Sequence, residues 1–271
     1  MSDSKEQAKA WLQGLVGKHL PANVRRFKVQ VYHAEASINA LGLQTDLHPA
    51  EGRLVEIGED WVAIKTARTE FFVCKKSLME SVPELGATVR VTPYARRQFD
   101  GTRLDTPKEE DYGGHKMMIL KIGERISPIP LDKQTLKSTH LKAMIQQVEE
   151  LPAPDGVRTI AQMLIDSGAS SEPVYFEDPL DEDCIEPPPT LEFRVTSEKW
   201  NGYLQVIYER AMDYYRVQLT EPSKAEVVTE IKDVDFTSLG EVIANLVDDD
   251  RWRIAKVEVL KPGPRKVAQA A

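Results

Sequence analysis

The tetrapeptide Tyr112–Gly113–Gly114–His115 contains the residue types that come nearest to a catalytic site in this sequence. A pair of glycines allows the backbone to approach a ligand closely, and a histidine side chain can act as a general base near neutral pH. The same four residues also suit a flexible turn that leads into a strand. The sequence therefore leaves open an enzyme with a site around Tyr112–His115, although we assign no catalytic residue.

Patterns that identify known catalytic and metal-binding sites do not occur in the sequence. It has no Walker loop, no glycine-rich dinucleotide fingerprint, no GxSxG elbow and no HExxH motif. Its five histidines and two cysteines are scattered without the spacing that metal ligands require. We therefore predict no metal and no cofactor, and we favour a protein that is not an enzyme.

Basic and aromatic residues interleave along the first half of the chain, as they do in small barrels that bind nucleic acids. Such barrels stack bases on aromatic rings and neutralise phosphates with lysine and arginine side chains. Alternation along a strand also predicts that many of these aromatic residues lie in a core, so this interpretation is one of several. If the first half binds nucleic acid, we expect the phosphate contacts to come from Arg25, Arg26, Lys75, Lys76, Arg96 and Arg97.

Charge divides the sequence into two halves. Residues 1–145 contain 22 Lys and Arg against 18 Asp and Glu, whereas residues 146–271 contain 13 against 25. An asymmetry of this size indicates two bodies with different partners, or two halves that attract each other.

An acidic, proline-rich segment lies within the second half. Residues 170–192 hold eight acidic residues and five prolines, and no lysine or arginine. Because such a composition buries too little apolar surface to fold, we predict a solvated, semi-rigid linker over residues 170–190. An alternative function is that of an acidic inhibitor protein that acts through residues 172–192.

The elements that must position these residues follow from the hydrophobic periodicity. Alternating strands with short turns over residues 20–125, among them Glu70–Lys75 and Ala87–Pro93, predict a small antiparallel β-barrel-like module. Residues 1–19 have the apolar spacing of an amphipathic helix, with Ala8, Trp11, Leu12, Leu15 and Val16 on one side.

The remainder of the chain predicts helices and a second sheet. Residues 126–169 form a helical segment appended to the barrel, after a long polar loop from Arg96 to Gly114. Residues 191–262 predict an antiparallel α+β domain that includes the strand Arg251–Leu260, and residues 263–271 form a basic tail. The predicted fold class is therefore α+β.

The central strands also follow a recognisable order of motifs. In sequence they are Gly52–Arg53–Leu54–Val55, Trp61–Val62–Ala63–Ile64, Phe72–Val73, Leu78, Val82–Pro83–Glu84–Leu85–Gly86 and Val89–Arg90–Val91. This order resembles the KfrB-type domain found in accessory proteins of plasmids and related mobile elements. The resemblance covers residues 50–95, implies an accessory role in binding, and brings no catalytic residues.

We therefore predict a non-enzymatic accessory or regulatory protein of a prokaryotic plasmid, phage or integrated element. The sparse cysteines favour a cytoplasmic protein, and no apolar run approaches the roughly 20 residues that a membrane-spanning helix needs. We expect a protein partner, with nucleic acid as a further candidate ligand of the N-terminal half, and no membrane.

Overall fold

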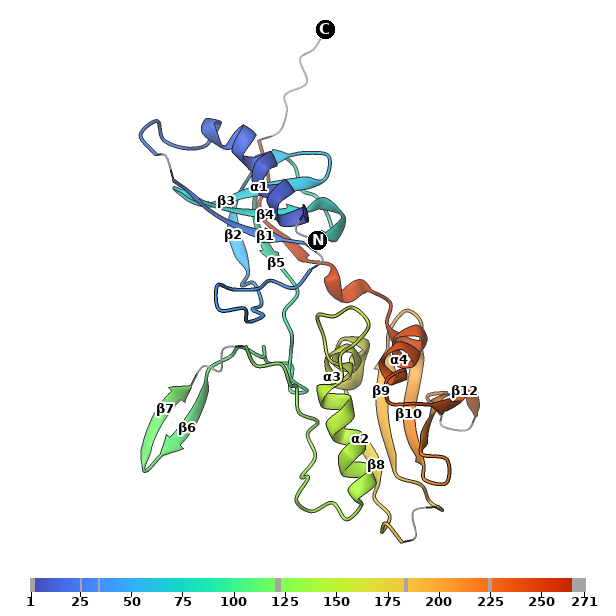
Figure 1. Cartoon of the computed structure of the whole chain (residues 1–271). Coiled ribbons are helices and arrows are strands. Elements are labelled where there is room, and N and C mark those ends of the chain that lie inside the picture. Colours follow the sequence, from blue (N-terminus) through green and yellow to red (C-terminus); the bar gives the residue numbers. More distant parts are fainter. Residues whose placement is uncertain are drawn as a thin grey trace. The chain divides into compact units, whose positions relative to one another are not determined.

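The computed structural model describes residues 3–24, 26–33, 35–119, 123–182, 185–223 and 226–264. The chain folds into two compact units (Figure 1). Unit 1 consists of Met1–Ile38, Asp46–Ala95 and Arg253–Ala271, and unit 2 of Asn39–Thr45 and Arg96–Trp252. Both units combine helices with strands, so the predicted α+β class is confirmed.

Unit 1 is built on a six-stranded sheet with the order β1-β4-β3-β2-β5-β13. β1 runs parallel to β4, and every other neighbouring pair is antiparallel. The strands are β1 (Lys28–Tyr32), β2 (Ala50–Ile57), β3 (Trp61–Ala67), β4 (Glu70–Lys75), β5 (Thr88–Thr92) and β13 (Lys256–Lys261). A 3-10 turn, η2 (Lys76–Leu78), follows β4.

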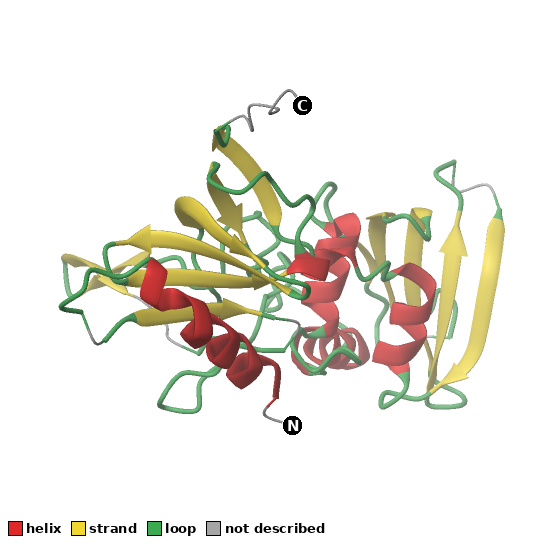
Figure 2. Cartoon of the chain, turned by 90° about the horizontal axis from the view of Figure 1, so that it is seen from above, coloured by secondary structure: helices red, strands yellow, loops and turns green. Residues whose placement is uncertain are grey.

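Both sides of this sheet bury apolar side chains. On one side, helix α1 (Asp3–Leu15) and the 3-10 turn η1 (Val16–Lys18) cover a cluster formed by Ala8, Leu12, Val16, Val31, Trp61, Ala63, Phe71 and Val73. The other side carries a second cluster, which includes Leu54, Val62, Ile64, Phe72, Val89 and Val91. Figure 2 shows α1 lying across the strands of this sheet. The predicted N-terminal helix is therefore confirmed, and its apolar side faces the sheet.

The last strand of unit 1 comes from the far end of the chain. β13 pairs with β5, with Val257 opposite Val91 and Glu258 opposite Arg90. The prediction that this strand belongs to the C-terminal domain is therefore wrong. Strands offer the same backbone donors and acceptors to any partner, so an amino-acid pattern does not select the sheet that a strand joins.

No sheet formed by the described residues closes into a barrel. The two edges of the unit 1 sheet are nevertheless tied at one end. The hydroxyl of Tyr32, at the end of β1, donates to the carbonyl oxygen of Arg253, just before β13, at 2.7 Å. Burial raises the pKa of this hydroxyl to about 12, so it stays a donor. The barrel-like curvature itself stays a prediction.

Unit 2 is a five-stranded antiparallel sheet with helices on one face. Its strand order is β12-β11-β10-β9-β8. The strands are β8 (Tyr175–Glu177), β9 (Thr190–Thr196), β10 (Asn201–Glu209), β11 (Tyr214–Thr220) and β12 (Val227–Val234). The helical elements are α2 (Thr139–Glu150), α3 (Ile160–Leu164), the π-helical turn η3 (Ile165–Ala169), α4 (Leu239–Val247) and the 3-10 turn η4 (Arg251–Arg253), whose last residue belongs to unit 1.

One apolar core joins the helices of unit 2 to their sheet. Its members include Leu141, Met144, Ile160, Leu164, Phe193, Leu204, Val217 and Ile243. The prediction that residues 126–169 extend the barrel-like module is therefore wrong, because α2 and α3 contribute to the core of unit 2, in which α2 contacts β9 and β10. Helical periodicity shows that one side of a helix must be buried, but it does not specify the surface that buries it.

The acidic segment begins as a structural part of unit 2. Tyr175–Glu177 forms β8 beside β9. Asp178 accepts hydrogen bonds from the backbone amides of Lys137 and Ser138, both at 2.8 Å. Carboxylates at a helix N-terminus satisfy free amides and interact favourably with the helix dipole.

A second carboxylate of this segment also caps α2. Asp181 accepts from the hydroxyl of Thr139 at 2.7 Å and from its amide at 2.9 Å. The predicted solvated linker over residues 170–190 is therefore wrong for residues 175–181, which are held by a strand and by two caps. Asp183 and Cys184 lie outside the described residues.

A separate hairpin belongs to unit 2. β6 (Lys108–Tyr112) and β7 (His115–Ile119) pair only with each other among the described strands (Figure 1). Gly113 and Gly114 form the turn with φ values of 62° and 88°, the left-handed conformation that a tight hairpin turn needs. The sequence analysis predicted a loop from Arg96 to Gly114, and β6 is a correction to it. The charged run Lys-Glu-Glu-Asp lacks the apolar alternation that identifies a strand.

Within the described part of the chain, we find no helix with the length and apolar character needed to cross a membrane.

Candidate nucleic-acid interface

The sheet of unit 1 has one side that α1 covers only in part. Directly opposite residues on neighbouring strands lie on the same side of a sheet, so the strand registers define rows of side chains. One such row begins at Phe71 on β4, which belongs to the cluster under α1. It continues through Lys65 on β3 to Arg53 on β2. From Lys65 onward this side is polar. We call it the polar face, and it consists of Glu51, Arg53, Lys65, Thr88, Arg90, Thr92, Lys256, Glu258 and Lys261.

The first row of the polar face is basic. It runs Lys65, Arg53, Thr88 and Lys261 across β3, β2, β5 and β13. The ammonium group of Lys65 donates to the carbonyl oxygen of His19 at 2.6 Å, which fixes the lysine beside the end of η1. Arg53 and Lys261 are exposed to solvent. Three positive charges therefore lie in one row, with no acidic residue among them.

The second row places an arginine between two carboxylates. Arg90 on β5 lies opposite Glu51 on β2 and Glu258 on β13. Its guanidinium group donates to Glu51 at 3.0 Å and to Glu258 at 3.1 Å. The hydrogen bond with Glu51 is the main reason that the pKa of Arg90 is raised above its usual value. The row is net negative by one charge.

The third row is basic again. Thr92 on β5 lies opposite Lys256 on β13, and Lys256 is exposed. The polar face thus has a basic, an acidic and a basic row, with five basic residues against two acidic ones.

The unit that carries the polar face is also the one with a positive net charge. Unit 1 contains 17 Lys and Arg against 12 Asp and Glu, and unit 2 contains 18 against 31. These numbers give net charges of +5 and −13. The division predicted from the two halves of the sequence is therefore slightly larger in the folded units, because residues 253–271, with five basic residues and one acidic residue, belong to unit 1. An anionic ligand is favoured by unit 1 and opposed by unit 2.

The structure separates the residues that the sequence analysis expected to contact phosphates. Arg25 lies outside the described residues. Arg26 precedes β1, whereas Lys75 ends β4 and Lys76 follows it. Because β1 and β4 are parallel, with Lys28 opposite Glu70 and Tyr32 opposite Cys74, Arg26 lies at the opposite end of this strand pair from Lys75.

The remaining two expected residues belong to unit 2. Arg96 is only 3% exposed, and its guanidinium group donates to the carbonyl oxygens of Glu124 at 3.2 Å and Gln44 at 3.4 Å. A buried guanidinium with these partners stabilises the loop and is not presented to a phosphate. Arg97 is exposed and donates to the carbonyl oxygen of Gly101 at 2.8 Å. The six residues therefore do not form one surface.

Sequence reasoning missed the residues of the polar face. In β13 the sequence Lys-Val-Glu-Val alternates in a way that predicts a strand with Lys256 and Glu258 on one side. That signal was available, but the pairing of β13 with β5 was not. Only this pairing brings Lys256 and Lys261 onto the same face as Arg53.

The Tyr112–His115 tetrapeptide forms the tip of the β6–β7 hairpin. Both Tyr112 and His115 are exposed, and neither lines one of the two described cavities. Tyr112 and His115 are paired across the turn, and the Tyr112 hydroxyl lies 3.4 Å from a carboxylate oxygen of Glu110. This geometry is that of a hairpin turn in solvent, so it does not assemble a general base with a substrate cleft.

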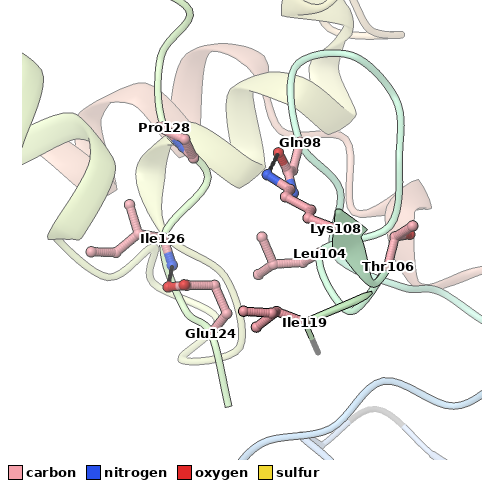
Figure 3. A pocket seen from close by; sticks show the side chains of 8 residues that line it. All are labelled: Gln98, Leu104, Thr106, Lys108, Ile119, Glu124, Ile126 and Pro128. Atoms are coloured by element: carbon pink, nitrogen blue, oxygen red, sulfur yellow. Dashed lines mark hydrogen bonds between the residues drawn. The ribbon is translucent and has the colours of Figure 1, made fainter. Parts of the chain in front are cut away.

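A small cavity lies at the base of the same hairpin (Figure 3). It has a volume of about 130 Å³ and is lined by Gln98, Leu104, Thr106, Lys108, Ile119, Glu124, Ile126 and Pro128. The ammonium group of Lys108 donates to Gln98 at 2.9 Å, and Glu124 accepts from the amide of Ile126 at 3.4 Å. Both charged groups therefore have a partner in the chain, and the lining is half polar and half apolar.

Across the described ranges, no three His, Cys, Asp or Glu side chains are grouped so that they would hold a metal ion. Comparisons of the chain with family models, curated proteins and solved structures find no match.

Proposed function

We propose that the chain is a non-enzymatic accessory protein that binds nucleic acid through the polar face of unit 1. The observation that carries this proposal is the basic first row, in which Lys65, Arg53 and Lys261 share one row of the sheet, with Thr88 as its fourth member. Phosphate contacts from such side chains supply most of the affinity in sequence-independent binding. In this proposal unit 1 is a curled, barrel-like module.

The proposed setting is a prokaryotic mobile element, with the protein in the cytoplasm. The resemblance of residues 50–95 to KfrB-type domains supports this setting. The resemblance covers β2, β3, β4 and β5, and three of these strands, β2, β3 and β5, carry six of the nine residues of the polar face. A regulatory or accessory role in binding fits a module with exposed charge.

Fluorescence anisotropy with labelled oligonucleotides tests this function. The full chain should bind at low salt, and the binding constant should fall as salt is raised. The double variant Arg53→Gln/Lys261→Gln should reduce the slope of log K against log[salt] by about 2, since each phosphate contact contributes about 0.9. The folded state of each variant is checked by circular dichroism.

The matched control is Lys75→Gln/Lys76→Gln, which removes the same charge from the same unit. It should leave the salt slope unchanged. The proposal is overturned if the unmodified chain does not bind at low salt, or if the control double variant reduces the slope and the polar-face variant does not.

A protein partner is the second proposed ligand, and the β6–β7 hairpin supports it. Tyr112, Met117 and Met118 are 57%, 53% and 66% exposed on two strands that have no other neighbour among the described strands. Methionine adapts to irregular apolar surfaces, and exposed apolar groups that gather on one element mark interaction sites. We propose that unit 2 binds a protein through this hairpin.

Affinity capture from a prokaryotic host after nuclease treatment tests the second proposal. The variant Tyr112→Ser/Met117→Ser should lose a protein that the unmodified chain retains, whereas Lys116→Ser should still capture it. Capture that does not depend on the hairpin would contradict the proposal.

A further inference from the structure

We infer that the polar face binds duplex DNA across a groove, and that it discriminates against a single strand. This inference rests on the proposed function and adds the class of nucleic acid. It is carried by the order of the three rows, basic then acidic then basic, and by the kinds of side chain that the face lacks.

The dimensions of the rows match a duplex. Neighbouring strands are about 4.8 Å apart, so the first row, across β3, β2, β5 and β13, extends over about 14 Å. Along β5, Thr92 in the third row is four residue steps from Thr88 in the first, which places these rows about 13 Å apart. The major groove of B-DNA is about 12 Å wide. One phosphate strand can therefore follow Arg53 and Lys261, while the other passes Lys256 and the hydroxyl of Thr92.

The acidic row lies where a duplex has no phosphates. Glu51 and Glu258 hold the side chain of Arg90 between them at 3.0 and 3.1 Å. With the two phosphate strands on the outer rows, these carboxylates face the groove between the strands. A flexible single strand that crosses the face from Arg53 to Lys256 would bring a phosphate against Glu51 or Glu258, and like charges repel.

The face also lacks the groups that single-strand binding requires. Proteins that bind single strands stack the bases on aromatic rings. None of the nine residues of the polar face is aromatic. The nearby aromatic residues Trp61, Phe71 and Phe72 are at most 7% exposed and lie in the two apolar clusters. Contacts from this face therefore neutralise phosphates and leave single-stranded bases without a stacking partner.

Competition binding with the full chain tests the inference. A labelled DNA duplex of mixed sequence is displaced by the same unlabelled duplex, by each of its single strands, and by an RNA duplex of the same sequence. We expect the DNA duplex to compete at least about tenfold better than either single strand. The log-log salt slope for the duplex should be about −3 to −4, from three or four phosphate contacts at about 0.9 each.

Two variants connect this preference to the rows. Glu51→Gln/Glu258→Gln removes both carboxylates of the second row. It should improve competition by the single strands by several fold, so that the ratio of duplex to single-strand affinity falls. Lys256→Gln removes the positive charge of the third row. It should weaken duplex binding and leave single-strand binding unchanged. Glu80→Gln/Glu84→Gln removes the same charge as the first variant, away from the polar face, and should not alter the preference.

The possible outcomes separate the inference from the proposed function. Equal or tighter binding of the single strands, with the salt slope still dependent on Arg53 and Lys261, overturns the duplex inference and leaves nucleic-acid binding in place. Tighter binding of the RNA duplex also overturns it, because the A-form major groove is too narrow for this contact. Absence of binding to every probe at low salt overturns the proposed function itself.

Discussion

Unit 1 and unit 2 use their charged residues in different ways. In unit 1 several basic side chains lie exposed on a sheet face. Lys65 donates to the carbonyl oxygen of His19, and its ammonium group has three N–H donors in all. In unit 2 many carboxylates serve the fold. Asp155, Asp166 and Asp248 surround the guanidinium group of Arg158.

Other acidic residues of unit 2 have similar structural roles. Glu149 is 3% exposed and accepts from the amide of Ile129 at 2.7 Å and from the ammonium group of Lys133 at 2.5 Å. Asp178 and Asp181 cap α2. Net charge alone therefore does not identify a binding surface. The net charge of unit 1, +5, is smaller in magnitude than that of unit 2, −13. Unit 1 is nevertheless the unit whose sheet presents a row of exposed basic side chains to solvent.

The largest expected effect is a loss of stability in unit 2 when its buried arginine is replaced. Arg158 has no exposed side-chain surface, contacts Asp155 and Asp166 at 3.0 Å each, and lies 4.1 Å from the ring centre of Trp252. Arg158→Met removes the buried cation that three carboxylates share, which should cost about 3–5 kcal/mol of unfolding free energy. Hydrogen exchange should show lost protection in α3 and α4, while β2 to β5 stay protected.

The control for this experiment is an exposed arginine of the same unit. Arg251 is 64% exposed and pairs with Glu198 at the surface. Arg251→Met should change stability by no more than about 0.5 kcal/mol. If both variants cost the same, the carboxylates around Arg158 are not what holds this unit together.

The next effect concerns the helix that covers unit 1. Leu12 on α1 is fully buried against the sheet. Leu12→Ala removes apolar contacts and leaves a cavity, so we expect a loss of about 3 kcal/mol, measured by denaturant unfolding. Gln13→Ala, on the exposed side of the same helix, should have little effect. A small loss at Leu12 would mean that the cluster around Phe72 alone holds unit 1.

A smaller effect compares two glycines, one in each unit. Gly114 has φ of +88° and no atom within 4 Å of an added Cβ, so Gly114→Ala changes only the backbone preference. It should destabilise the hairpin by about 1–2 kcal/mol, seen as faster exchange over residues 108–119. Gly14 in α1 is equally open without a positive φ, and Gly14→Ala should stabilise unit 1 by about 0.5–1 kcal/mol. If both substitutions stabilised the protein, or both destabilised it, the left-handed turn at Gly114 and the helical conformation at Gly14 would be contradicted.

The smallest effect is the pH dependence of the α2 cap. A hydrogen bond from the Thr139 hydroxyl, the largest cause, lowers the pKa of Asp181 below its usual value of 3.8. A carboxyl group with a lowered pKa in the folded state stabilises the fold above its unfolded pKa, and this stability is lost as the pH falls through the folded value. Asp181→Asn should therefore flatten the decrease in stability below about pH 4, in thermal melts. Glu182→Gln removes the same charge and should leave the profile unchanged, whereas an unchanged profile for Asp181→Asn would show that the cap contributes nothing.

The sequence by itself determined most of the local structure. Glu70–Lys75 is a strand with the predicted bounds, because four apolar residues in a row follow one turn and precede another. The N-terminal helix and its buried side follow from the spacing of Ala8, Leu12 and Val16. Such patterns depend on periods of 2 and 3.6 residues, which neighbouring residues fix without reference to the rest of the chain.

The candidate site was decided only by the tertiary structure. None of the five expected basic residues that the structure describes lies on the polar face, and one of them, Arg96, is buried. The face exists because β13, from the end of the chain, pairs with β5, and because Arg53 and Lys65 lie in register on β2 and β3. The physical reason is that hydrophobic alternation fixes which side of a strand is buried, whereas backbone hydrogen bonds are alike in every strand. The choice of neighbours, and with it the meeting of distant charges, depends on how the whole core packs.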